Sequence, residues 1–474
     1  MKPARRALGA AAAILLLPIA ACSVAPLPSR PANAPAEPPA GQLLLLERVS
    51  WGANRASLSE IQSLGSKAWL ERQLDPRLPE ALPPQVQAQI DAMEISRRSV
   101  PDLIEQFRGK RKEAKDDPEK RKALQQELNG LAREAATRSL LRAVYSPRQL
   151  ESQMTWFWMN HFSVFQGKGP VRALVGDYEE RAIRPHALGR FRDLLGAMAH
   201  HPAMLAYLDN ARNAAGHVNE NYARELMELH TLGVEAGYTQ QDVQELARIL
   251  TGVSIGPEGY RFYLRRHDGD DKEFLGRLIH GGGEEEVEQA LDLLARQPAT
   301  ARFVSRKLAL YFVSDEPGAA LVDRLAAVFS ASDGDIAAVL RALFDSPEFH
   351  ASLGEKFKDP VHYVVSALRL AYDGQPMPNA NPPLAWLFRM GEPLYGRQTP
   401  DGYPLVRTAW SSAGQLATRF EVARAIAGTA AVTAPGPLEY PRPLGAATQA
   451  ALAKATTPGE RNQLLLSSPE FMSR

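Results

Sequence analysis

The sequence predicts a mainly α protein, a multi-helix globular body with one small β ribbon. Three observations lead to this fold class. From residue 43 onward, apolar residues recur mostly at helical spacing. Long alternating strand patterns joined by Asn-Gly turns do not occur in the sequence. Hydrophobic residues make up 45% and charged residues 23% of the 474 residues, as in an ordinary folded protein that buries a large core.

The chain begins with the features of an export signal. Basic residues within the first six positions precede a small or apolar run at 7–20, which is shorter than the about 20 residues of a membrane-spanning helix. The run ends in Ile-Ala-Ala before Cys22, the one cysteine of the sequence. This ending resembles a bacterial lipobox, which implies removal of residues 1–21 and a palmitate-type lipid on Cys22. An ordinary signal peptide with an incidental cysteine is the alternative.

The lipobox resemblance also implies a destination. Ser23 follows Cys22 in place of an aspartate retention signal, which implies an anchor in the outer membrane, facing the periplasm. Residues 22–42 are rich in proline and alanine, a composition that buries too little apolar surface to fold and predicts an extended tether. The expected organisation is a signal peptide at 1–21, the lipidated tether at 22–42 and a helical body at 43–474.

The charge balance excludes one class of partner. Lysine and arginine number 55 against 54 acids, so the chain lacks the basic excess that binds nucleic-acid phosphates. Residues 102–142 carry dense charge of both signs. This pattern predicts an exposed pair of helices broken near residues 116–118, and not a membrane or nucleic-acid surface.

Local patterns justify further elements in chain order. Residues 57–60 offer hydroxyl caps and a helix start. The run Asn219 to Gly233 predicts a strong helix with Gly233 as its C-cap. Residues 259–265 alternate in polarity and predict a short strand or hairpin arm.

Candidate chemistry concentrates in the middle of the chain, because eight of the ten histidines lie between residues 161 and 280. Asn160 and His161 stand in an aromatic segment at 154–162. One hypothesis places His161 in an aromatic-walled pocket as a ligand or base. The alternative is a core helix whose end His161 caps.

The helix at 219–233 carries a second candidate. Glu225 and His230 flank an apolar stripe, so both are expected at a burial boundary, where an unpaired carboxylate or imidazole is costly. They either form an acid/base or metal site with Asn221, or Arg224 and His230 simply neutralise Glu225 and Glu228. The helix has neither the His-Glu-x-x-His nor the Glu-x-x-His spacing. A divalent metal is therefore only weakly supported.

A third candidate runs from His267 to Lys272, directly after the predicted strand. Its acids, Asp268 among them, could bind a cation, but their spacing does not match a calcium loop. A charged surface turn is the alternative interpretation.

The ordered motifs resemble one bacterial family, known as domain of unknown function 1800, across residues 43–474. The stretches that carry the resemblance are 48–52, 157–162, 183–189, 201–209, 219–233, 237–252, 267–276, 400–404 and 468–471. One departure matters, because the family segment usually reads Trp-His-Asn-His and Met159 stands here in place of the first histidine. The resemblance implies exported proteins without an established activity, and a sulfatase-like exported protein encoded nearby as a partner.

These observations leave two hypotheses. We expect an envelope lipoprotein that acts with a secreted partner or as an assembly factor, with its polar residues forming a buried network. The alternative is a hydrolase-like enzyme. Its pocket would take catalytic residues from His161, Glu225, His230 and His267 and binding residues from Asn160, Asn221, Asp268 and Lys272.

Overall fold

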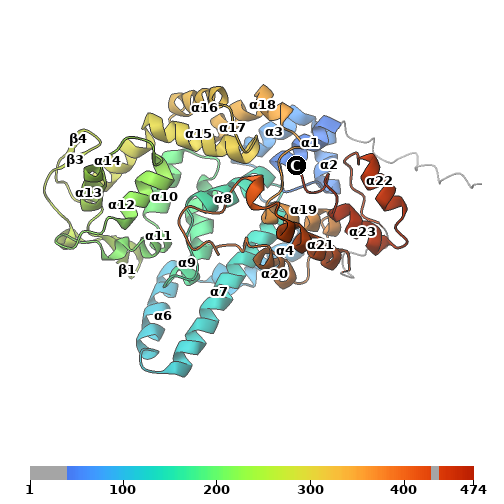
Figure 1. Cartoon of the computed structure of the whole chain (residues 1–474). Coiled ribbons are helices and arrows are strands. Elements are labelled where there is room, and N and C mark those ends of the chain that lie inside the picture. Colours follow the sequence, from blue (N-terminus) through green and yellow to red (C-terminus); the bar gives the residue numbers. More distant parts are fainter. Residues whose placement is uncertain (1–39, 429–436) are drawn as a thin grey trace, which may run out of the picture. The chain divides into compact units, whose positions relative to one another are not determined.

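The computed structural model describes residues 40–428 and 437–474. It confirms the predicted fold class, because helices dominate and the described strands form two small antiparallel pairs (Figure 1). The α-helices are α1 Ala40–Val49, α2 Arg55–Leu64, α3 Ser66–Leu74, α4 Pro84–Asp91, α5 Glu94–Arg97, α6 Val100–Glu113, α7 Pro118–Tyr145, α8 Gln149–His161, α9 Val171–Asp177, α10 Phe191–Ala199, α11 Pro202–Tyr207, α12 Asn221–Glu225, α13 Gln240–Ile249, α14 Glu284–Ala295, α15 Pro298–Phe312, α16 Ala319–Ala331, α17 Ile336–Phe344, α18 Pro347–Ala351, α19 Pro360–Tyr372, α20 Asn381–Arg389, α21 Ala413–Ala427, α22 Ala446–Ala453 and α23 Pro458–Leu466. Shorter helical segments are the π-helices η1 Tyr178–Ile183 and η4 Leu226–Thr231, with 3₁₀ turns η2 Arg184–His186, η3 Asn210–Arg212, η5 Leu264–Arg266 and η6 Arg407–Ala409.

The N-terminal predictions fall mostly outside the described residues. The signal peptide, Cys22 and the tether up to residue 39 lie there, whereas α1 already begins at Ala40. Within the described ranges, every helix is too short or too polar to cross a membrane.

The predicted charged helix pair is α6 and α7, and it forms a long hairpin (Figure 1). The break falls at the predicted place because Asp117 caps α7, with Pro118 at its first position, where proline is tolerated. Leu103, Leu128 and Leu131 of the hairpin form a small apolar cluster with Ala173 of α9, while other residues of α6 and α7 join the two larger cores. A minor core thus joins the hairpin to α9.

The predicted ribbon is present, and a second one accompanies it. Strand β2 (Gly259–Phe262) pairs with β1 (Val253–Gly256). Strand β3 (Lys272–Phe274) pairs with β4 (Arg277–Ile279), a sheet that the sequence did not predict. The end of the predicted polar turn at 267–272 therefore belongs to a strand.

Helix α8 is buried on nearly all sides and lies in the interior of the helical body (Figure 1). Buried polar side chains along a helix need internal partners, because an unpaired polar group away from water is costly. The polar residues of α8 accordingly reach to other elements, and His161 at its end reaches η4.

The predicted helix at 219–233 changes its winding halfway. α12 continues into the π-helix η4, where the amide of Leu232 bonds the carbonyl of Met227 at 2.8 Å, five residues back. Such π segments are rare, and those that do occur are often found at functional sites. Gly233 ends the run at φ +84°, the left-handed conformation expected of its C-cap.

Candidate functional site

The site begins with two imidazoles that meet inside the protein. His161 at the end of α8 donates from Nε2 to the carbonyl oxygen of His230 at 3.0 Å, and the two ring centres are 6.2 Å apart. Their side chains are buried, and the ring of Phe162 packs against both at 4.4 and 5.2 Å. The predicted aromatic surroundings of His161 are therefore present. His161 bonds a distant carbonyl group and not the end of its own helix.

Both imidazoles are neutral at physiological pH. Burial lowers the pKa of His230 to about 3, and the charge of Lys307 acts in the same direction. Burial also lowers the pKa of His161 well below its usual range, followed by the effect of Lys307. Neither ring can therefore carry a proton between a substrate and water near pH 7.

Lys307, on α15, is the cation that faces this pair, and the sequence reasoning missed it. Burial lowers its pKa to about 8, although Asp401 opposes the shift. Its ammonium lies 5.4 Å from the ring centre of Phe303, which itself lies 6.1 Å from the His161 ring. In the sequence, Lys307 is one lysine of an amphipathic helix, and this alone could have marked it as a candidate.

Glu225 belongs to the same region and is half-buried. Burial, followed by the carboxylate of Glu228, raises its pKa above the usual range, and Asp401 adds to this although Arg224 opposes it. Asp401 thus lies within electrostatic range of both Glu225 and Lys307. We call the region formed by His161, His230, Lys307, Glu225 and Asp401 the junction site.

Asn160 fixes the loop that supplies Asp401. Its amide group donates to the Tyr403 carbonyl at 3.0 Å and accepts from the Tyr403 amide at 2.6 Å. Gly402 lies so close that a Cβ there would come within 2.1 Å of the Asn160 carbonyl oxygen. Asp401 is held in turn by Arg397, at 2.7 Å. The predicted binding residue Asn160 therefore positions a loop.

The remaining predicted residues lie in other surroundings. Asn221 is exposed at the start of α12 and donates to the Leu208 carbonyl at 3.2 Å. His267 and Lys272 are buried, and they bond Glu286 on α14 at 2.9 and 2.5 Å. We call these three residues the Glu286 cluster.

The Glu286 cluster is an internal ion-pair network. His267 also bonds the Thr251 carbonyl at 2.8 Å through Nδ1, so both ring nitrogens are engaged. Asp268 pairs with Arg248 at 2.8 Å, and this hydrogen bond lowers the pKa of Asp268. The surface-turn interpretation is wrong for His267 and Lys272, because their side chains are almost fully covered.

A further polar network escaped the sequence reasoning entirely. His362 bonds Asp359 at 2.7 Å and Tyr311 at 3.2 Å, and the ring of Trp51 lies 4.4 Å from the imidazole. The sequence could have indicated this network through the Asp359-x-x-His362 spacing at the start of α19, because Asp359 caps that helix.

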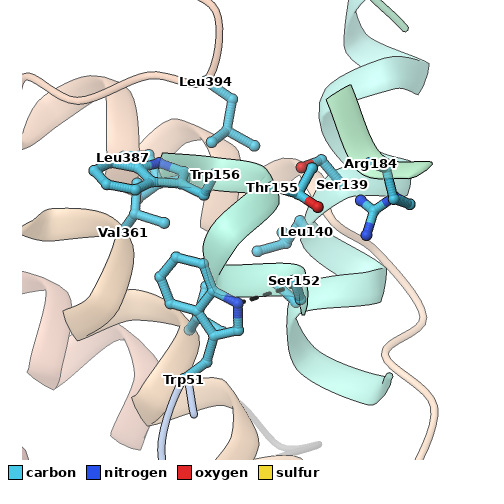
Figure 2. A pocket seen from close by; sticks show the side chains of 12 residues that line it. Trp51, Ser139, Leu140, Ser152, Thr155, Trp156, Arg184, Val361, Leu387 and Leu394 are labelled. Atoms are coloured by element: carbon cyan, nitrogen blue, oxygen red, sulfur yellow. Dashed lines mark hydrogen bonds between the residues drawn. The ribbon is translucent and has the colours of Figure 1, made fainter. Parts of the chain in front are cut away.

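Two adjoining hollows lie next to these networks. The first, of about 330 Å³, has Trp156, Leu387 and Val361 on one side and Ser139, Thr155 and Arg184 on the other (Figure 2). The second, of about 460 Å³, shares Trp156 with the first. Its lining further includes Met159, Asn160, Glu179, Glu392, Arg397 and Tyr403.

Met159 therefore lines a hollow at the position where the resemblance predicts a histidine. The thioether makes this wall apolar at the point where it adjoins Asn160. In residues 40–428 and 437–474, no three side chains of the His, Cys, Asp and Glu types gather as a metal site would require.

The chain belongs to the family described as "Protein of unknown function (DUF1800)", whose model matches residues 44–473. The match spans both networks and the junction site. No curated protein and no solved structure matches the chain.

Proposed function

We propose that the protein is a lipid-anchored protein of the bacterial cell envelope that acts by binding, together with an exported partner, and not by histidine-mediated catalysis. The proposal that histidines do not act in catalysis rests on the burial and bonding of the imidazoles. His161, His230 and His267 are buried. His161 and His267 bond internal partners, and the pKa of His230 lies near 3. Rings that are buried, and either neutral, as in His161 and His230, or bonded to internal partners at both nitrogens, as in His267, stabilise packing and are not available to exchange protons with a substrate.

The lipobox-like run before Cys22 supports the anchor. An acyl chain contributes about 0.8 kcal/mol per buried methylene, so several chains hold a protein firmly on a bilayer. The tether then joins the lipid to the helical body. The sulfatase-like exported protein implied by the family resemblance is the proposed partner.

The anchor is tested by metabolic palmitate labelling of the full chain and by membrane fractionation. We expect label and outer-membrane recovery for the wild type and for the matched control Ser23→Ala. Both should be lost in Cys22→Ser. Label retained in Cys22→Ser, or a wild type that stays in the soluble fraction, would overturn the lipid anchor.

The binding role is tested by co-purification with the sulfatase-like protein after co-expression. Asp401→Lys reverses a charge at the junction site, and we expect it to lower recovery of the partner at least several-fold. Asp345→Lys makes the same change at another exposed position and should have no effect. Equal recovery for both variants would remove the junction site from partner binding.

One observation favours the alternative, a hydrolase-like enzyme. Glu225 is half-buried with a raised pKa, as expected of a general acid. Metal analysis of the wild type, Glu225→Gln and the matched Glu228→Gln separates the two functions. We expect no stoichiometric metal in any of them. One equivalent of metal that is lost only in Glu225→Gln would establish the alternative.

A further inference from the structure

Three charged side chains line the second hollow, of about 460 Å³, and two of them are already paired. Glu179 forms an ion pair with Arg184 at 2.7 Å. Arg397 forms one with Asp401, also at 2.7 Å. Within the part of the chain that the structure describes, the third side chain, Glu392, has no ion pair of its own.

Glu392 is covered completely by the protein and is still only half bonded. Its side chain is 0% exposed, and its Oε2 atom accepts from the Val361 amide at 3.0 Å. Its Oε1 atom receives no hydrogen bond from the described residues. The neighbouring carboxylate of Asp359 can only accept, so Glu392 can bond it only by keeping a proton. Burial, followed by Asp359, raises the pKa of Glu392 well above its usual range, although Arg419 opposes the shift.

This carboxyl group determines which charge the hollow favours. A buried carboxyl without a counter-charge stays protonated, because its ionised form is poorly solvated inside a protein. A cation in the hollow lowers that cost, since opposite charges attract more strongly away from water. An anion has no free cationic partner in the wall, because Arg397 already binds Asp401. The hollow therefore favours a positively charged ligand.

The walls favour an organic cation over a metal ion. Trp156 is half-buried and lines both hollows, and its ring is stacked on Tyr311 with 5.8 Å between the centres. Aromatic faces attract organic ammonium groups, and tryptophan does so best. The thioether of Met159 adds an apolar surface beside it. A hard metal ion requires several oxygen ligands, and the described residues offer no cluster of this kind.

Tyr395 forms another part of the wall and is held there in a strained conformation. Its φ is +57°, a left-handed value that a bulky residue keeps only where its surroundings impose it. Its hydroxyl donates to Glu179 at 2.5 Å. Strained residues of this type gather at ligand sites, where the strain holds the site ready for its ligand.

We propose that the second hollow binds a small primary ammonium compound, with Glu392 as its anionic partner and Trp156 and Tyr395 as its aromatic walls. The ammonium group donates to Oε1 of Glu392, and the apolar part of the ligand packs against Trp156 and Met159. Glu392 gives its proton to the solvent as the ligand enters, so one positive charge replaces another. This site goes beyond the partner binding proposed above and does not depend on it.

The test titrates n-butylammonium chloride into the full chain with Cys22→Ser and follows the heat of binding at pH 7. Butanol and butyrate have the same carbon chain without the positive charge, and tetramethylammonium has the charge without an N–H group. We expect saturable binding of butylammonium, about tenfold tighter than that of each comparison compound. Repeating the titration in two buffers with different ionisation enthalpies and no primary amine should show release of about one proton per ligand.

A matched pair of variants locates the binding. Glu392→Gln keeps the shape of the side chain and removes its charge, so it should weaken butylammonium binding about tenfold and abolish proton release. Glu258→Gln makes the same change at an exposed position outside the hollow and should retain both. Circular dichroism checks that each variant is folded.

Three results would overturn the proposal. They are butanol or sodium chloride binding as tightly as butylammonium, unchanged affinity in Glu392→Gln, and binding without proton release. If Glu392→Gln fails to fold, the compound series and the proton count on the unchanged hollow still decide the question. None of these measurements involves the lipid or the exported partner, so failure here is distinct from failure of the proposed function.

Discussion

Replacing Glu286 with alanine should destabilise the protein far more than removal of a surface acid. The Lys272 and Glu286 side chains are both 0% exposed and lie 2.5 Å apart. Glu286 also accepts from His267 at 2.9 Å and from the Gly282 amide at 2.8 Å. Alanine would leave the Lys272 ammonium buried without a counter-charge, a change that costs about 3–5 kcal/mol in comparable pairs.

Urea unfolding followed by circular dichroism measures this loss. Glu348→Ala is the matched control, because Glu348 pairs with Arg324 at 2.7 Å while the two side chains are 40% and 53% exposed. That exposed pair should contribute about 1 kcal/mol or less. The double variant Lys272→Met with Glu286→Leu should recover much of the loss, because apolar side chains of similar volume replace a buried ion pair well.

The pH dependence of this stabilisation has a definite sign. Burial alone would raise the pKa of Glu286, but hydrogen bonds from Lys272 and His267 lower it below 4.5 in the folded protein. The contribution is therefore complete above pH 4.5 and is lost as the pH falls through the lower, folded value. A loss in Glu286→Ala no larger than that in Glu348→Ala would refute the reasoning.

Three further predictions follow from named positions. Gly402→Ala should lower the free energy of unfolding, measured by heat or urea, by several kcal/mol more than Gly374→Ala. Both glycines have left-handed φ values, +76° and +87°, so the backbone strain of an alanine is similar at the two positions. Only at Gly402 would the added Cβ also clash with the Asn160 carbonyl. Equal losses would contradict this. The ring of His230 should stay neutral from pH 8 to 4 in histidine NMR, because its folded pKa is near 3, and a titration near 6.5 would disprove its burial. As the pH falls, the unfolded state protonates His230 before the folded state does. His230 should therefore lower the free energy of unfolding between pH 6.5 and 3 by at most about 1.4 kcal/mol per pH unit, and His230→Gln should show a smaller pH dependence.

Local patterns were sufficient to predict the helical class, the α6–α7 break and the Gly233 cap. Each depends on neighbouring residues in the chain, such as Asp117 before Pro118. The π-helix η4 was not predictable in this way. Its residues have ordinary helical propensity, and only the hydrogen bond from the Leu232 amide to the Met227 carbonyl reveals the five-residue spacing.

The candidate residues show the same division. Aromatic neighbours correctly indicated the surroundings of His161, but no local pattern placed it on the carbonyl of His230, 69 residues later. The sequence around His267 and Lys272 predicts a polar turn, but in the structure Glu286 from α14 bonds both side chains and they are buried. Lys307 carried no motif, because its unusual state arises from burial beside groups on other elements.

The sequence by itself determined the helical class and the family, and it predicts an export signal and a lipid anchor, because all of these depend on periodicity and on short contiguous motifs. Tertiary structure alone decided which polar residues meet, which are neutral and which carboxyl group lines a hollow. The physical reason is that pKa values and the cost of burial depend on distances in space and on exclusion of water. Neither quantity is fixed until distant segments pack together.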